Sequence, residues 1–198
     1  ICFLGYDAAP LIFETRGLPR SKWAQKDWGS SMDRYRGSQI GVVVQCEGGH
    51  VLVPNYHSAV AFDAAGKEVK RWEGGGNHHA NWLEAVAKRD ASILNASILE
   101  GHLSSGLCHL GNISHRLGEK VAASDIADEL VANDLLSDSF ERMCGHLRAN
   151  QIDIERGALT LGPMLQLDPT QENFNGNQQA NALLRREYRE PFGVPRIA

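Results

Sequence analysis

The segment 97–118 constrains the fold more than any other part of this chain. Its apolar side chains recur at steps of three and four residues, which is the period of an amphipathic helix; they are Leu99, Leu103, Leu107, Leu110, Ile113 and Leu117. The pattern predicts one long central helix with an apolar face packed against the rest of the domain. Gly118 follows the last apolar residue, at a position where glycine commonly ends a helix.

A second row of side chains on this predicted helix is polar and comprises His102, Ser105, His109, Asn112 and Arg116. Their spacing places them on one line of the helix surface. Such a row can line a cleft, although a solvated face or an interface is the more common explanation. The helix also holds three glycines, each of which costs roughly 1 kcal/mol relative to alanine. We therefore expect another backbone to approach Gly101, Gly106 and Gly111 closely.

The chain before this helix has the composition of β structure. An initial hairpin is expected over 1–6 and 10–17, followed by a long irregular stretch. Three or four strands then follow at hairpin spacing, separated by turns rich in Gly, Pro, Asn and Asp; they are 39–47, 50–55, 58–63 and 67–73. The simplest sheet for this pattern is an antiparallel meander. After it, Asn77 is the candidate N-cap of a helix over 78–89.

Beyond the central helix the pattern predicts two short helices, a strand and a last short helix. The corresponding segments are 124–133, 136–150, 158–176 and 177–188, with Ser124 as a candidate N-cap and a surface tail over 189–198. Strands followed by helices are typical of an α+β domain. We expect a single domain over 1–198, with an open antiparallel or mixed sheet and helices packed on one face.

Composition narrows the classes of partner. The net charge is −4, with acidic and basic residues interspersed, which disfavours nucleic-acid binding. No apolar run approaches the roughly 18 residues needed to cross a bilayer, which disfavours a membrane partner. The first thirty residues lack the pattern of a signal peptide, so the compartment is not indicated. No CxxC pair occurs among Cys2, Cys46, Cys108 and Cys144, and buried free thiols are the expected state.

Histidines offer the most promising chemistry, because five of the eight fall on the two predicted helices after the sheet. Their spacing does not match a zinc motif, and neither a GxSxG elbow nor a GxGxxG phosphate loop is present. His78 and His79 follow three glycines at a predicted helix start, where an anionic group is favoured. They could contact a sugar or carboxylate substrate, or they could simply cap the helix.

Several segments resemble the C-terminal half of bacterial Gfo/Idh/MocA-family oxidoreductases. They are PLIFETRGLP, the strands up to FDAAGKEV, NHHANWLEAVAKRD, LNASILEGHLSSGLCHLGNISHRLGEKV and NQQANALLRREYREPFGVP. The resemblance implies a preceding Rossmann domain that binds NAD or NADP, with the lysine, aspartate and histidine of the family's catalytic machinery located before Ile1. It therefore implies no catalytic, cofactor-binding or metal-binding residue in this chain. The segment 123–156 departs from the family pattern and is expected to be a helical insertion.

From this resemblance we expect the substrate-binding and assembly domain of an NAD(P)-dependent oxidoreductase that acts on a sugar or polyol derivative. The predicted substrate contacts are His78, His79, Asn81, Arg16 and His109. An uncovered sheet face would favour a homo-oligomer. Two alternatives remain: a non-catalytic module for carbohydrate binding or assembly, and a related NAD-dependent glycosidase.

Overall fold

The structure is a computed structural model that describes residues 1–27, 29, 31–130 and 133–193. Within these residues the chain forms two compact units. Unit 1 comprises Ile1–Glu14, His102–Cys144 and Asp153–Ala198, and unit 2 comprises Thr15–Gly101 and Gly145–Ile152. Each unit is described by itself below.

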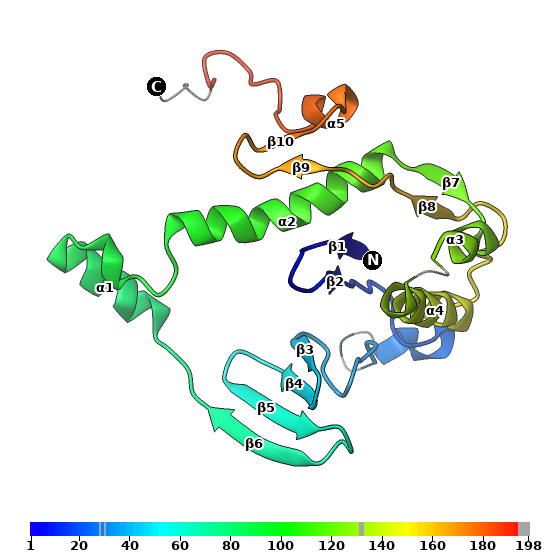
Figure 1. The fold of residues 1–198 in the computed structure, drawn as a ribbon, viewed down its shortest axis with the longest axis horizontal. Coiled ribbons are helices and arrows are strands. Elements are labelled where there is room, and N and C mark those ends of the chain that lie inside the picture. The colour runs from blue at the N-terminus through cyan, green and yellow to red at the C-terminus, as the bar shows by residue number, and fades with distance from the viewer. Residues whose placement is uncertain (28, 30, 131–132, 194–198) are drawn as a thin grey trace. The chain divides into compact units, whose positions relative to one another are not determined.

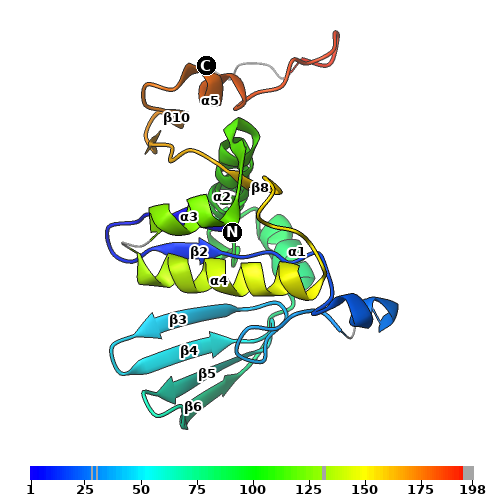
Figure 2. The same cartoon turned by 90° about the vertical axis from the view of Figure 1, so that its right-hand side faces the viewer.

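Unit 2 contains the largest sheet, a four-stranded antiparallel meander (Figures 1 and 2). The strands pair in chain order, as the turn chemistry predicted; they are β3 (Val42–Cys46), β4 (Gly49–Val53), β5 (Ser58–Asp63) and β6 (Glu68–Glu73). The turn between β5 and β6 is held by the Asp63 carboxylate, which accepts hydrogen bonds from the backbone N–H groups of Ala65 and Lys67 at 3.0 and 2.9 Å.

The two faces of this sheet differ in burial. Leu52 pairs with Val60 in the register, and both are buried, at 9% and 3% exposure. Successive side chains of a strand point to opposite faces, so the neighbours of these residues along each strand belong to the other face. On that face Val42 and Val44 remain about half exposed, at 54% and 49%. The sheet is therefore packed on one face and open on the other.

Helix α1 (His78–Lys88) begins where the sequence predicted. The Asn77 side chain caps it by accepting a hydrogen bond from the backbone N–H of Ala80 at 3.0 Å. Arg89 ends the helix in the left-handed conformation, with φ of 52°. Two short 3-10 helices complete the regular structure of this unit, η1 (Lys22–Asp27) inside the segment expected to be irregular and η2 (Ala91–Ile93) after α1.

Unit 1 is built around most of α2 (Ile98–Leu117), the predicted central helix (Figure 1). Its other elements are the predicted N-terminal hairpin, two short strand pairs and three helices: β1 (Cys2–Leu4), β2 (Leu11–Phe13), β7 (Glu119–Val121), α3 (Ala123–Leu130), α4 (Asp134–Ala149), β8 (Leu159–Leu161), β9 (Leu167–Asp168), β10 (Asn173–Phe174) and α5 (Gln178–Ala182). Helix α4 continues into unit 2 after Cys144.

A small apolar core closes this unit. Ile113 of α2, Phe174 of β10 and Ala180 of α5 are 4%, 2% and 0% exposed. Leucines pack around them, namely Leu110, Leu117, Leu165, Leu167 and Leu183. The Asn181 side chain holds the strand to the helix, because it accepts from the backbone N–H of Phe174 at 2.7 Å and donates to its carbonyl at 2.9 Å. The apolar face of α2 thus packs as predicted around Ile113, but the prediction is wrong for the first half of the helix, where Leu99 and Leu103 are 59% and 52% exposed.

Several local predictions need correction. Gly118 follows α2 but is not left-handed; it is needed because a Cβ there would lie 2.8 Å from the carbonyl carbon of Leu161 in β8. Of the three glycines within α2, only Gly111 has a close neighbour, and this is the side chain of Cys2 rather than a backbone. Helix α3 begins at Ala123, so Ser124 lies inside it and is not its N-cap.

The predicted helical segment 123–156 does contain α3 and α4. The expected helix over 124–133 ends at Leu130 in the described structure, and residues 131 and 132 lie outside the described part. The last helix is shorter than predicted, since α5 ends at Ala182. Residues 194–198 of the expected surface tail also lie outside the described part. The mixture of an antiparallel sheet and helices confirms the α+β class.

Candidate functional site

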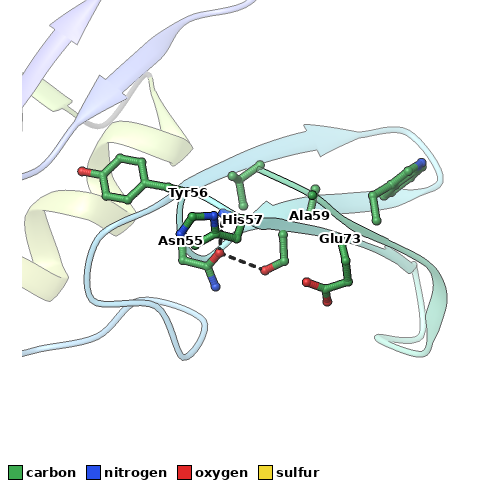
Figure 3. Close-up of a pocket in the computed structure, with 9 residues that line it drawn as sticks. Asn55, Tyr56, His57, Ala59 and Glu73 are labelled. Atoms are coloured by element: carbon green, nitrogen blue, oxygen red, sulfur yellow. Dashed lines mark hydrogen bonds between the residues drawn. The ribbon is translucent and has the colours of Figure 1, made fainter. Parts of the chain in front are cut away.

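Unit 2 carries an open hollow of about 280 Å³ at one end of the four-stranded sheet (Figure 3). The hollow lies where β4 ends, β5 begins and β6 ends. Its lining consists of Val53, Asn55, Tyr56, His57, Ser58, Ala59, Trp72, Glu73 and Gly74. The β4–β5 turn, the start of β5 and the end of β6 therefore supply its polar groups.

Asn55 shapes the loop that forms one wall. Its side-chain oxygen accepts hydrogen bonds from the backbone N–H of His57 at 2.7 Å and from the Ser58 hydroxyl at 3.2 Å, as the dashed lines in Figure 3 show. This is the local turn that asparagine commonly makes with the backbone two residues later. The opposite wall is tied to it, because the backbone N–H of Gly74 donates to the carbonyl of His57 at 2.7 Å.

The glycine segment 74–76 passes directly beside His57. A Cβ at Gly75 would lie 2.7 Å from the imidazole Nδ1 of His57, which is closer than side chains approach in folded proteins. A side chain at position 75 would therefore displace the imidazole from its observed position. The same segment continues into Asn77 and the start of α1, so the hollow and the helix start are joined by only a few residues.

Aromatic side chains contribute the apolar part of the hollow. Trp72 is 43% exposed, and the Lys70 ammonium lies 4.9 Å from its ring centroid. Tyr56 is 89% exposed and points away from His57 and Glu73 in Figure 3. An aromatic face beside amide, imidazole, hydroxyl and carboxylate groups offers both apolar contact and hydrogen bonds of both senses.

Two of the predicted substrate contacts, His78 and His79, lie together in the structure. Their rings are 4.0 Å apart between centroids, with an interplanar angle of 42°, at the exposed first turn of α1. They belong to the same unit as the hollow and are connected to it through the glycine segment. Both imidazoles are therefore accessible to a ligand.

Asn81, the third predicted contact, serves the local fold. Its side-chain N–H donates to the carbonyl of Ile93 at 2.8 Å, and its oxygen accepts from the backbone N–H of Asn95 at 2.9 Å. Both ends of the amide thus tie α1 to the segment that follows it. To contact a ligand as well, the Asn81 amide would have to use the hydrogen-bonding capacity that these two bonds leave free.

Arg16 belongs to a polar cluster that does not line the hollow. Its Nε lies 3.0 Å from the Asp33 carboxylate, and its side chain is only 12% exposed. The His146 ring, which is 5% exposed, has its Nδ1 3.4 Å from the same carboxylate oxygen. Burial lowers the pKa of His146 from its ordinary value; the Asp33 charge opposes this shift and the Arg16 charge adds to it.

His109, the remaining predicted contact, is an exposed residue of α2 in unit 1. The structure thus gathers His78, His79 and Asn81 on α1 and places Arg16 and His109 elsewhere. Sequence reasoning missed Asn55, His57, Trp72 and Glu73. The available signal was the Pro54–Asn55 turn, which predicted the bend but not that its side chains would meet the end of β6.

The described residues contain neither a metal-binding cluster nor a parallel βαβ unit. Nowhere in the described ranges do three or more His, Cys, Asp or Glu side chains gather where they could hold a metal ion. Every strand pair in this part of the chain is antiparallel, so the described residues contain no parallel βαβ unit of the kind with which Rossmann folds bind dinucleotides. None of the described helices is long and apolar enough to cross a membrane.

Comparison with known proteins gave no match: no family model, no curated protein and no solved structure corresponds to this chain.

Proposed function

We propose that this chain is the substrate-binding and assembly domain of a Gfo/Idh/MocA-like oxidoreductase that acts on a sugar or polyol derivative. The observation that carries the proposal is the hollow at the end of β6, whose lining includes Trp72, Asn55, His57 and Glu73. Sugars present an apolar ring face and several hydroxyl groups, and this lining offers a complement to each. The sequence resemblance suggests the family, and an antiparallel meander followed by helices is compatible with the α+β domain that the resemblance implies.

In this proposal the chain binds and orients the substrate. Nicotinamide chemistry, which transfers a hydride to or from a carbinol carbon, would be supplied by a cofactor bound to the preceding Rossmann domain. Trp72 would contact the apolar ring face, while Asn55 and His57 would hold hydroxyl groups. His78 and His79, at the start of α1, would contact a second part of the same molecule. Orientation of this kind raises the rate by fixing the reacting carbon in line.

The open sheet face supports the assembly part of the proposal. Val42 and Val44 of β3 are about half exposed, and exposed apolar surface of this kind commonly marks a protein interface. We expect a homo-oligomer that buries this face. Light scattering of the protein and of Val44→Lys tests it: the substitution should shift the protein toward monomer, and a wild-type protein that is already monomeric would contradict the expectation.

The substrate proposal is tested in the parent enzyme with His57→Ala, Trp72→Ala and His79→Ala. Each should lower kcat/KM about tenfold, which corresponds to the loss of about 1.4 kcal/mol of binding to the transition state. His115→Ala, an exposed histidine of α2, is the matched control and should leave kcat/KM unchanged. Unchanged kcat/KM in all three site variants would exclude this hollow as the substrate site.

Two alternative functions would give different experimental results. A parent protein that binds sugar but lacks a dinucleotide-binding domain would be a carbohydrate-binding or assembly module. A parent that requires bound NAD yet releases free sugar from a glycoside, without net reduction of NAD, would be the related glycosidase. Product analysis together with measurement of the nicotinamide absorbance separates the three.

A further inference from the structure

We propose that Cys2 and Cys108 form a reversible disulfide when the protein is oxidised, which ties β1 to the middle of α2. Both residues belong to unit 1. The inference does not depend on the proposed function, because it concerns thiols outside the hollow.

The close approach of Cys2 to α2 is the first step of the argument. A Cβ placed on Gly111 would lie 2.8 Å from the Sγ of Cys2 and 3.3 Å from its Cβ. The Cys2 side chain is therefore seated directly on the helix, in the space that the missing side chain of Gly111 leaves. Gly101 and Gly106, in the same helix, have no such neighbour within 4 Å.

Helix geometry then places Cys108 beside Cys2. Cys108 precedes Gly111 by three residues, and residues at this spacing are neighbours on one face, about 5 to 6 Å apart between Cβ atoms. The Cys2 thiol thus lies within one helical turn of the Cys108 thiol. A disulfide needs the two Cβ atoms about 3.5 to 4.5 Å apart, so its formation requires side-chain rotation and a shift of the short strand β1 along the helix toward Cys108.

The two thiols differ in exposure, which assigns them different roles. Both are free, with Cys108 exposed and Cys2 half-buried. Burial raises the pKa of the Cys2 thiol, and the nearby Cys108 adds to this shift. Cys108 is therefore the thiol that an oxidant reaches first, and Cys2 is the resolving thiol.

With a peroxide as oxidant the reaction balances in two steps. The Cys108 thiolate attacks one peroxide oxygen, the O–O bond breaks, and a sulfenic acid and hydroxide result. The Cys2 thiolate then attacks the Cys108 sulfur and expels the second hydroxide, which takes up a proton. Two thiols and one hydrogen peroxide thus give one disulfide and two waters. A thiol reductant reverses the cross-link by disulfide exchange.

Peptide mapping under non-reducing conditions tests the proposal in the full-length protein after treatment with hydrogen peroxide. We expect a peptide in which Cys2 is linked to Cys108, accompanied by loss of the mass of two hydrogen atoms from the intact chain. Cys2→Ser and Cys108→Ser should each abolish the linked peptide, whereas Cys46→Ser, at an exposed thiol of β3, should leave it unchanged.

A matched pair of glycine variants tests the geometry. Gly111→Ala places a methyl group where the Cys2 thiol sits and should slow formation of the cross-link several-fold. Gly106→Ala adds the same methyl group at an open position of the same helix and should not. Oxidation that stops at sulfenic or sulfinic acid on Cys108, or that joins Cys108 only to another chain, would overturn the proposal, as would equal cross-linking rates in the two glycine variants.

Discussion

The two units differ in the polar side chains that they bury and in the surfaces that they leave open. Unit 1 closes over an apolar core in which Ile113, Phe174 and Ala180 are almost fully buried. Unit 2 leaves one face of its sheet open and buries a polar cluster that includes His146 and Asn150, at 7% and 5% exposure. The difference shows that similar apolar patterning in a sequence leads to a covered core in one place and to exposed surface in another. It also places the candidate binding surfaces in unit 2.

The largest effect should come from the core of unit 1. Phe174→Ala removes a ring that is 2% exposed and should lower the free energy of unfolding by about 3 to 5 kcal/mol. Phe13→Ala, at a residue that is 49% exposed in β2, is the matched control and should cost much less. Urea denaturation measures both. Equal losses would mean that the core does not dominate the stability of this unit.

The two faces of the unit 2 sheet should respond differently to the same substitution. Val60→Ala, at a residue that is 3% exposed, should cost about 2 kcal/mol of unfolding free energy. Val44→Ala, at 49% exposure on the opposite face, should cost only a fraction of this under conditions in which the protein is monomeric. A comparable loss at Val44 would indicate that another part of the protein, or another copy of it, covers that face.

Asn81 should behave as a structural residue. Asn81→Ala removes hydrogen bonds to Ile93 and Asn95 and should lower the free energy of unfolding by about 1 to 2 kcal/mol. Asn112→Ala, at an exposed position of α2, should be close to neutral. Thermal unfolding distinguishes them. If Asn81→Ala left stability intact but weakened substrate binding, the original expectation of a ligand contact would be restored.

The polar cluster of unit 2 should give the smallest effect, visible as a dependence of stability on pH. Burial lowers the pKa of His146 below its ordinary value of 6.5, so the folded chain favours the neutral ring while the unfolded chain still takes up a proton near that pH. The stability that the neutral ring provides is therefore fully present above about pH 6.5. It is lost as the pH falls from there through the lower pKa of the folded state.

Urea denaturation at a series of pH values measures this dependence. Replacement by glutamine, His146→Gln, should make the slope of unfolding free energy against pH shallower below neutrality. An increase of wild-type stability on acidification that disappears in the variant would show instead that the Asp33 charge dominates and holds the ring protonated.

Local signals predicted much of the fold. The three- and four-residue period from Leu99 to Leu117 defined α2 almost to its ends, and Asn77 marked the start of α1. The turn residues after Cys46, Val53 and Asp63 gave the meander in the correct order. These features depend on residues close together in the chain, where hydrogen bonding and backbone preference act directly.

The candidate site could be predicted only in part from local sequence signals. His78 and His79 were found because a helix start is a local feature. The contact between the Asn55 turn and the end of β6 depends on strand register. The contact of the Cys2 side chain with Gly111 brings together residues that are far apart in the chain. The sequence predicts Arg16 as a substrate contact. Its ion pair with Asp33, and the burial of His146 beside that pair, could not be foreseen from the residues that surround Arg16 in the chain.

The sequence by itself determined the α+β class, the order of the strands in the meander and the positions of the long helices, because periodicity and capping are properties of short segments. It did not predict β7, or that the strand expected over 158–176 is divided into β8, β9 and β10. Only the tertiary structure decided which apolar faces are covered, which glycines are required and which polar groups meet. These outcomes depend on packing between distant segments, where a close approach such as that of Gly118 to Leu161 has no local signature.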